Sequence, residues 1–161
     1  MAHYTGARSE NWCKTASMRA RLGCQLTTLV AILLLQSLLF GQTASQKVSV
    51  KDGVFTAEQA ERGNAIYQSK CVMCHGNALE GRGLNSPLAG AAFLNKWDGQ
   101  TVSDLFMKTI VMMPAMDPGT MKPKETADVI AYILSVNKFP AGKTELPSVP
   151  QPLEMIRIVK P

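Results

Sequence analysis

The stretch of this sequence that decides its fold is Cys71-Val72-Met73-Cys74-His75. Two thiols stand three positions apart, and an imidazole follows directly. This C-x-x-C-H spacing is the signature of covalent haem attachment. Two cysteines at a helix end can reach both vinyl groups on one edge of a porphyrin, and the adjacent histidine then lies under the iron. The motif therefore predicts one haem c, attached through Cys71 and Cys74 and ligated by His75.

Three other interpretations of the motif compete with haem attachment. A thioredoxin-like dithiol is expected between a strand and a helix, and no strand pattern precedes the motif. A structural zinc site needs four ligands, but the only further candidates are His3, Cys13 and Cys24, all near the N-terminus. A chance match is the third alternative. The export signal, the preceding helix and the downstream Met-Pro loop together argue against it.

The N-terminal segment has the organisation of an export signal. A basic region, Met18–Leu22, precedes an apolar run, Leu26–Phe40, and the small residues Ala44 and Ser45 follow. We predict a signal peptide over residues 1–45, cleaved near its end, and hence a periplasmic protein. Translation from the methionine that opens the basic region is an alternative start. An uncleaved membrane anchor is the competing interpretation, although spanning a bilayer needs about 20 apolar residues.

Much of the positive charge lies in this leader. The full chain has a formal net charge of +5. Residues 1–45 carry four basic and one acidic side chain, a net of +3, and residues 46–161 carry 13 basic and 11 acidic side chains, a net of +2. Two haem propionates would bring the exported part near neutrality. No run of lysine and arginine interleaved with aromatic residues is present, so we expect no nucleic-acid partner.

Three helices are predicted in the exported domain. Thr56 is a good N-cap for a helix over Ala57–Lys70, with Gln59 at the reciprocal position of a capping box. A second helix is predicted from Thr101 to about Val111. A third, over Lys124–Asn137, has apolar residues repeating at three and four and so one buried face.

The segments between and after these helices are rich in turn formers. Residues 76–99 are predicted as a glycine-rich loop and 112–123 as a Met/Pro/Gly loop. We assign the exported domain to residues 46–142 and a proline-rich, extended tail to 143–161, which we expect to wrap the domain. The fold is therefore predicted to be all-α, with a thin core that needs a large cofactor as a staple.

Several stretches around the motif resemble the class I cytochromes c. Gly63 and Tyr67 precede it as in that family, and Asn85–Gly90 is similar to the family's proline loop. Met113-Pro114 and the stretch Ala127–Ser135 look like its ligand loop and C-terminal helix. The resemblance runs from about Thr56 to Gly142 and implies the cytochrome c fold, in which three main helices and long loops pack around the haem.

A narrower resemblance concerns the stretches Phe93–Phe106 and Asn137–Gly142. These look like the cytochromes and cytochrome domains that serve quinoprotein alcohol dehydrogenases. This likeness implies a dehydrogenase as the electron donor, and an oxidase or another cytochrome as the acceptor.

The resemblance also implies roles for three further residues. Met113, directly before a proline, corresponds to the sixth iron ligand of the family, whereas Met112, Met116 and Met121 are expected as core side chains. The carbonyl of Pro87 is expected to accept a hydrogen bond from His75 and thereby strengthen its donation to iron. Trp97 is expected either to place its indole N–H near a haem propionate or simply to fill the core.

These expectations combine into a periplasmic single-electron carrier rather than an enzyme. An iron ligated by His75 and Met113 has no open position for substrate, and the haem edge beside Val72 and Met73 is the expected exit for electrons. We expect a monomer with redox proteins as partners and a weak salt dependence of docking. Two alternatives stay open: a ligand-binding or peroxidase-like protein if Met113 does not bind, and a membrane-anchored subunit if the leader is retained.

Overall fold

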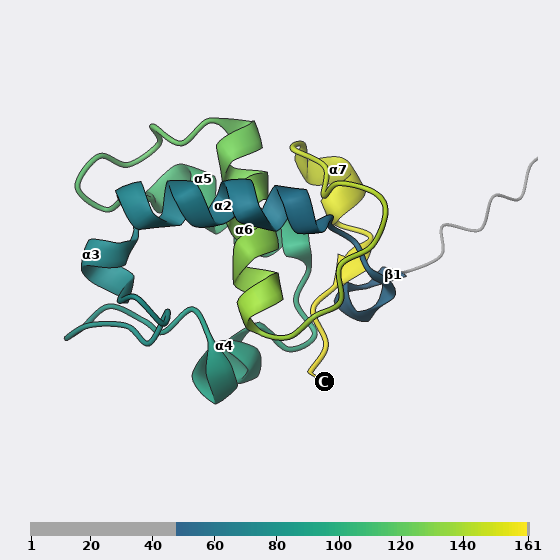
Figure 1. Ribbon diagram of the computed structural model, residues 1–161, viewed down its shortest axis with the longest axis horizontal. Coiled ribbons are helices and arrows are strands. Elements are labelled where there is room, and N and C mark those ends of the chain that lie inside the picture. The colour runs from purple at the N-terminus through teal and green to yellow at the C-terminus, as the bar shows by residue number, and fades with distance from the viewer. Residues whose placement is uncertain (1–47, 161) are drawn as a thin grey trace, which may run out of the picture. The chain divides into compact units, whose positions relative to one another are not determined.

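The computed structural model describes residues 48–160 (Figure 1). The predicted signal peptide lies outside these residues. The elements, in chain order, are β1 (Val48–Ser49), a 3₁₀ turn (Val50–Asp52), α2 (Ala57–Lys70), α3 (Val72–His75), α4 (Gly90–Trp97), α5 (Val102–Met112), α6 (Pro123–Val136), α7 (Pro150–Leu153) and β2 (Ile156–Arg157). The prediction of an all-α fold is confirmed, since β1 and β2 are the only named strands of the described part and hold two residues each. Within residues 48–160, no helix is both long enough and apolar enough to span a membrane.

The three predicted helices are all present. The bounds of α2 agree with the prediction. Both ends of α5 and both ends of α6 lie one residue away from the predicted positions. The prediction that 76–99 is loop throughout is wrong, because α4 occupies its last part. Phe93 and Trp97 stand one helical turn apart on α4, and both are buried, with ring centroids 6.3 Å apart. The glycines on either side of this short helix hid its periodicity.

The frame of the domain is the crossing of α2 over α6 (Figure 1). Gly63 of α2 faces the backbone of α6, and a Cβ at this position would collide with the carbonyl of Asp128. One turn further along, the rings of Tyr67 and Tyr132 pack with centroids 5.3 Å apart. Gly63 therefore allows the two helix backbones to approach as closely as they do.

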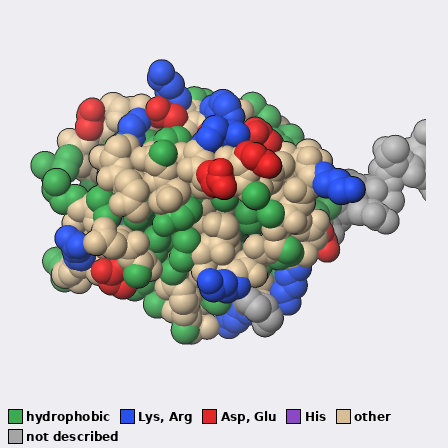
Figure 2. Space-filling model, in the orientation of Figure 1, with side chains coloured by type: hydrophobic (Ala, Val, Ile, Leu, Met, Phe, Trp, Pro, Cys, Tyr) green, Lys and Arg blue, Asp and Glu red, His purple; other side chains and the backbone are tan. Residues whose placement is uncertain are grey.

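Ion pairs reinforce this crossing from outside. Arg62 on α2 donates to Asp128 on α6 at 3.1 Å and to Glu145 at 2.7 Å. Lys70 at the end of α2 reaches Glu125 on α6 at 2.8 Å. Figure 2 shows basic and acidic side chains side by side over this part of the surface, with apolar side chains exposed below them.

Glu125 also caps the start of α6. Its carboxylate accepts a hydrogen bond from the backbone N–H of Lys122 at 3.2 Å. The ion pair with Lys70 and this cap both favour the ionised form, and they lower the pKa of Glu125 below its usual value. The carboxylate of Glu125 therefore both caps α6 and links α6 to α2.

The tail folds against α2. The prediction that the tail is extended is wrong in part. It contains α7, and its β2 pairs in parallel with β1. The predicted capping box at α2 is half correct. Thr56 Oγ1 accepts from the Gln59 N–H at 3.1 Å, but the Gln59 side chain instead binds the backbone of Leu146, accepting at 2.7 Å and donating at 3.0 Å. A buried amide on α2 thus anchors the tail.

Candidate functional site

A cavity of about 540 Å³ opens between α3, α5, α6 and the loops that join them. This volume lies within the range of roughly 300–1,000 Å³ that is usual for cofactor sites. Its walls bring together all six residues singled out from the sequence: Cys71, Cys74, His75, Pro87, Trp97 and Met113. Residues separated by more than 40 positions in the chain therefore share one cavity.

The cysteines stand where α2 gives way to α3. Lys70 is the last residue of α2, and the Cys71 N–H still donates to the carbonyl of Tyr67 at 2.9 Å. Both thiols are free and half-buried. Burial raises the pKa of the Cys71 thiol to about 11, so it is protonated at neutral pH. A thioredoxin-like dithiol needs a thiol of lowered pKa, and Cys71 has the opposite property.

The helical turn that carries the histidine is held at both ends. The His75 N–H donates to the carbonyl of Cys71 at 2.9 Å. Beyond it, the buried hydroxyl of Tyr67 donates to the carbonyl of Gly76 at 2.6 Å. These bonds fix the order and spacing of the two thiols and the imidazole on the cavity wall.

The imidazole of His75 is buried, at 8% exposure, and its Nδ1 lies 2.9 Å from the carbonyl oxygen of Ser86. The prediction that Pro87 supplies this carbonyl is wrong by one residue. The oxygen belongs to the peptide that precedes the proline, while Pro87 itself lines the cavity. Since a carbonyl can only accept, Nδ1 donates to it, and Nε2 is the ring nitrogen left to bind a metal.

The methionine loop follows α5. Met113 comes directly after the last residue of α5, in extended conformation and half-buried, and its peptide bond to Pro114 is cis. Met112, Met116 and Met121 line the same cavity. The expectation that all three are core side chains is correct for Met121, which is 4% exposed, and wrong for Met112 and Met116, which are 50% and 91% exposed.

Trp97 is both a core residue and a cavity residue. Only 5% of it is exposed, and it packs against Phe93, yet it also lines the cavity. Lys96 and Lys108 line the cavity beside it, and the sequence had singled out neither. No spacing signal pointed to these lysines, or to Ser86, because their place at the site depends on how the loops and α5 pack.

The donor set fits a covalently attached haem. Two thiols and an imidazole whose Nδ1 contacts a backbone carbonyl lie on the wall of one largely apolar cavity, together with thioethers from the methionine loop. Within residues 48–160, no cluster of three or more His, Cys, Asp or Glu side chains could hold a metal ion by itself.

Comparison with known protein families gives one match. Residues 58–133 match the family model for cytochrome c oxidase, cbb3-type, subunit III. No curated protein and no solved structure matches the chain.

The matched residues run from the first turn of α2 into α6 and include all six predicted site residues. They therefore include both helices of the frame and the walls of the cavity. The match and the helical architecture together identify the cytochrome c fold. Residues 58–133 thus match a c-type cytochrome domain, and domains of this kind bind haem c covalently and transfer electrons rather than catalysing a reaction.

Proposed function

We propose that the protein is a periplasmic single-electron carrier with one low-spin haem. In this proposal Cys71 and Cys74 would hold the haem through thioether bonds, and His75 and Met113 would ligate its iron. The observation that carries it is the contact of His75 Nδ1 with the carbonyl of Ser86, in a ring that lines a cavity shared with Met113.

The protein side chains set the properties of the site. The haem supplies a one-electron iron couple. The Ser86 carbonyl increases the basicity of His75, and a thioether from Met113 favours the reduced state and raises the reduction potential. The ring of Pro114 restricts the backbone after Met113, and the Tyr67 hydroxyl, which donates to the carbonyl of Gly76, holds the turn that carries His75. Rigid ligands keep the rearrangement between the two redox states small.

Electrons leave, in this proposal, at the rim of the cavity beside Val72 and Met73. Met73 is 82% exposed, and Leu84 on the neighbouring loop is fully exposed. Both line the cavity, so a partner that covers them comes close to the cofactor. The near-neutral charge of the exported part favours docking through these apolar side chains, with little dependence on salt.

The partner assignment rests on the resemblance to cytochromes that serve quinoprotein alcohol dehydrogenases. We propose such a dehydrogenase as donor, an oxidase or another cytochrome as acceptor, and a monomer as the working form. Stopped-flow reduction by a quinoprotein alcohol dehydrogenase and its alcohol tests this. Fast reduction that changes little between low and moderate salt is expected, and failure of the dehydrogenase to reduce the protein contradicts the assignment.

Export is proposed through residues 1–45. N-terminal sequencing of protein recovered from the periplasm of an expressing bacterium is expected to begin at about residue 45 or 46. Recovery only in the membrane fraction, with the leader still attached, would instead indicate an anchored subunit.

The ligand assignment is tested by visible spectroscopy of protein exported together with the haem-attachment machinery. We expect a low-spin c-type spectrum, unchanged by carbon monoxide after reduction, with the weak far-red band of a methionine–iron bond. Met113→Ala is expected to abolish this band and to admit carbon monoxide. Met116→Ala is the matched control, because Met116 lines the same cavity but is 91% exposed, and it is expected to keep the band.

Two outcomes contradict the assignment. If the unaltered reduced protein binds carbon monoxide promptly, the sixth position is open and Met113 is not a ligand. If Met116→Ala removes the far-red band and Met113→Ala does not, the ligand is Met116.

A further inference from the structure

A buried amide at the end of α6 binds a segment more than 40 positions earlier in the chain. Asn137 directly follows the last residue of α6 and is 5% exposed. Its Nδ2 donates to the carbonyl of Ile133 in its own helix at 2.8 Å, and to the carbonyl of Leu88 at 2.9 Å. Its Oδ1 accepts a hydrogen bond from the Gly90 N–H at 3.0 Å. We call the two hydrogen bonds to Leu88 and Gly90 the Asn137 bridge.

The segment that the bridge holds is the one that contacts His75. Leu88 lies two residues after Ser86, whose carbonyl oxygen is 2.9 Å from His75 Nδ1. Pro87 stands between them, and its ring fixes the backbone φ angle there. The Leu88 N–H in turn donates to the carbonyl of Leu79 at 2.8 Å, so both backbone polar groups of Leu88 are hydrogen-bonded. A displacement of Leu88 is therefore passed through a stiff proline to the carbonyl that faces the imidazole.

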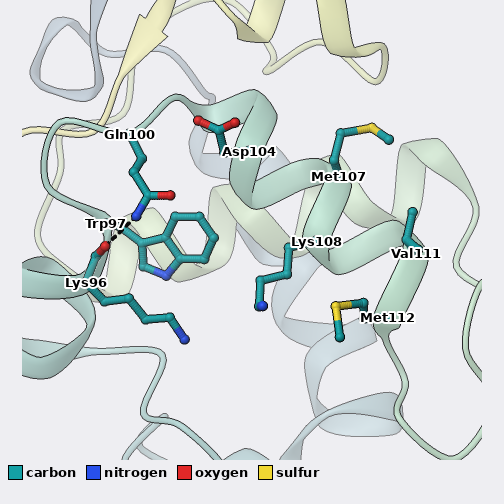
Figure 3. A pocket seen from close by; sticks show the side chains of 8 residues that line it. All are labelled: Lys96, Trp97, Gln100, Asp104, Met107, Lys108, Val111 and Met112. Atoms are coloured by element: carbon teal, nitrogen blue, oxygen red, sulfur yellow. Dashed lines mark hydrogen bonds between the residues drawn. The ribbon is translucent and has the colours of Figure 1, made fainter.

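The same amide also holds the start of α4. Gly90 is the first residue of this helix, and Ala89 before it has no side-chain oxygen to cap it. The Oδ1 of Asn137 accepts one of the N–H groups that a helix leaves free at its start. At the other end of α4, Figure 3 shows the ring of Trp97 directed toward α5. A loop and a helix that both line the cavity thus depend on one side chain.

A second buried amide allows the two roles of such a group to be separated. Gln59 is 1% exposed, and its side chain forms two hydrogen bonds with the backbone of Leu146. Neither Gln59 nor Leu146 lines the cavity. The two amides therefore stabilise the chain in a similar way, but only Asn137 is connected to His75.

We propose that Asn137 is a positioning residue for His75, which keeps the Ser86 carbonyl against Nδ1 and thereby sets how strongly the imidazole donates to iron. This inference rests on the ligation of haem iron by His75, as proposed above. A well-placed acceptor on Nδ1 makes the imidazole a stronger ligand. Stronger donation favours the oxidised iron, so the Asn137 bridge lowers the reduction potential.

The experiment measures the reduction potential of Asn137→Ala and Asn137→Ser, each loaded with haem. The serine hydroxyl can still bond to the carbonyl of Ile133, four residues earlier, but it is too short to reach both Leu88 and Gly90. Asn137→Ser therefore removes the bridge and keeps the contact with α6. At a fixed ambient potential, both variants are expected to raise the ratio of reduced to oxidised protein by about two- to fivefold, the order expected when one hydrogen bond is weakened.

The matched control is Gln59→Ala, which also loses the hydrogen bonds of a buried amide to the backbone. It is expected to lower the unfolding midpoint but to leave the ratio of reduced to oxidised protein unchanged within experimental error.

A second readout follows the bridge directly. In the reduced protein, NMR measures how fast the His75 Nδ1 proton and the Gly90 N–H exchange with solvent. Both are expected to exchange faster in the Asn137 variants than in Gln59→Ala. Because a general loss of stability speeds exchange in all three variants, the difference from Gln59→Ala measures the loss of the bridge.

The outcomes distinguish this inference from the proposed function. If the unaltered protein has the expected low-spin spectrum, but Asn137→Ser matches Gln59→Ala in potential and in exchange of the Nδ1 proton, the bridge does not position His75 and only this inference fails. That conclusion does not require Asn137→Ala to fold, because the serine variant carries the test by itself. If the unaltered protein carries no covalent haem, the proposed function fails, and this inference fails with it.

Discussion

The α2–α6 crossing and the cavity that His75 lines lie next to each other. Their side chains differ in how many contacts they make with the rest of the chain. At the crossing, chain contacts chain: the Gly63 backbone meets α6, Tyr67 packs on Tyr132, and Arg62 binds Asp128. Around the cavity, apolar side chains such as Met116 and Leu84 are highly exposed, and the His75 ring has one nitrogen engaged by the chain.

This difference separates what the polypeptide stabilises by itself from what the cofactor stabilises. The crossing has complementary partners on both sides, so it is expected to form from the chain alone. The loops at 76–89 and 113–122 contain little regular structure and face the cavity, so their order is expected to depend on haem.

The largest effect is expected when the cofactor cannot be attached. In the double variant Cys71→Ser/Cys74→Ser, haem cannot be attached covalently. We expect the free energy of unfolding to fall by about 5 kcal/mol or more, comparable with the whole stability of a small domain. Denaturant unfolding measures the loss, and hydrogen exchange is expected to show protection lost first in the two loops. An unchanged unfolding midpoint would show that the cavity side does not depend on haem.

A smaller effect is expected when the crossing itself is altered. In Gly63→Ala the new Cβ collides with the Asp128 carbonyl, so the helices must separate. We expect a destabilisation of about 2–3 kcal/mol from overpacking, despite the better helix propensity of alanine. Asn64→Ala, at the exposed neighbouring position of α2, is the control and should be neutral or stabilising. Equal unfolding midpoints for the two variants would contradict the close approach.

The anchor of the tail is tested by Gln59→Ala. Removal of the amide leaves the buried N–H and carbonyl of Leu146 without their partners, which costs about 2 kcal/mol. Limited proteolysis is expected to cleave the tail of this variant faster than that of the unaltered protein. Gln68→Ala, on an exposed position of the same helix, serves as control, and similar cleavage of both variants would show that the tail is held by other contacts.

The smallest effect is expected for the ion pair between Glu125 and Lys70. Because folding lowers the pKa of Glu125, its contribution is present above the ordinary value of 4.5 and disappears as the pH falls through the folded value. Glu125→Gln should therefore cost about 0.5 kcal/mol at pH 7 and nothing in strong acid. Thermal unfolding across this pH range measures the difference. Glu61→Gln, exposed and without an ion pair among the described residues, should show no such pH-dependent loss.

The fold was predictable where local signals agree with one another. The Thr56 cap and the apolar repeat of α6 predicted two helices to within a residue, because cap and periodicity are properties of neighbouring residues. The helix α4 was missed because eight residues between glycines carry a weak local pattern, and burial of Phe93 and Trp97 supplies the stability that the pattern lacks.

The sequence predicted which residues line the site, but it did not predict the hydrogen bonds that hold them. Cys71, Cys74 and His75 are close together in sequence, so their spacing alone predicts haem attachment. The acceptor for His75 was misplaced by one residue, since the direction of a backbone carbonyl depends on the path of the whole loop rather than on the residue type.

The sequence by itself determined the cofactor, its covalent attachment, the all-α class and the three main helices, because these depend on residues close together in the chain. Only the tertiary structure decided which carbonyl holds His75, which amide anchors the tail and which cations border the cavity. Ser86, Leu146 and Lys108 acquire these roles through packing between distant segments. Contacts of this kind leave no local pattern, since backbone groups and exposed lysines are present everywhere along a chain.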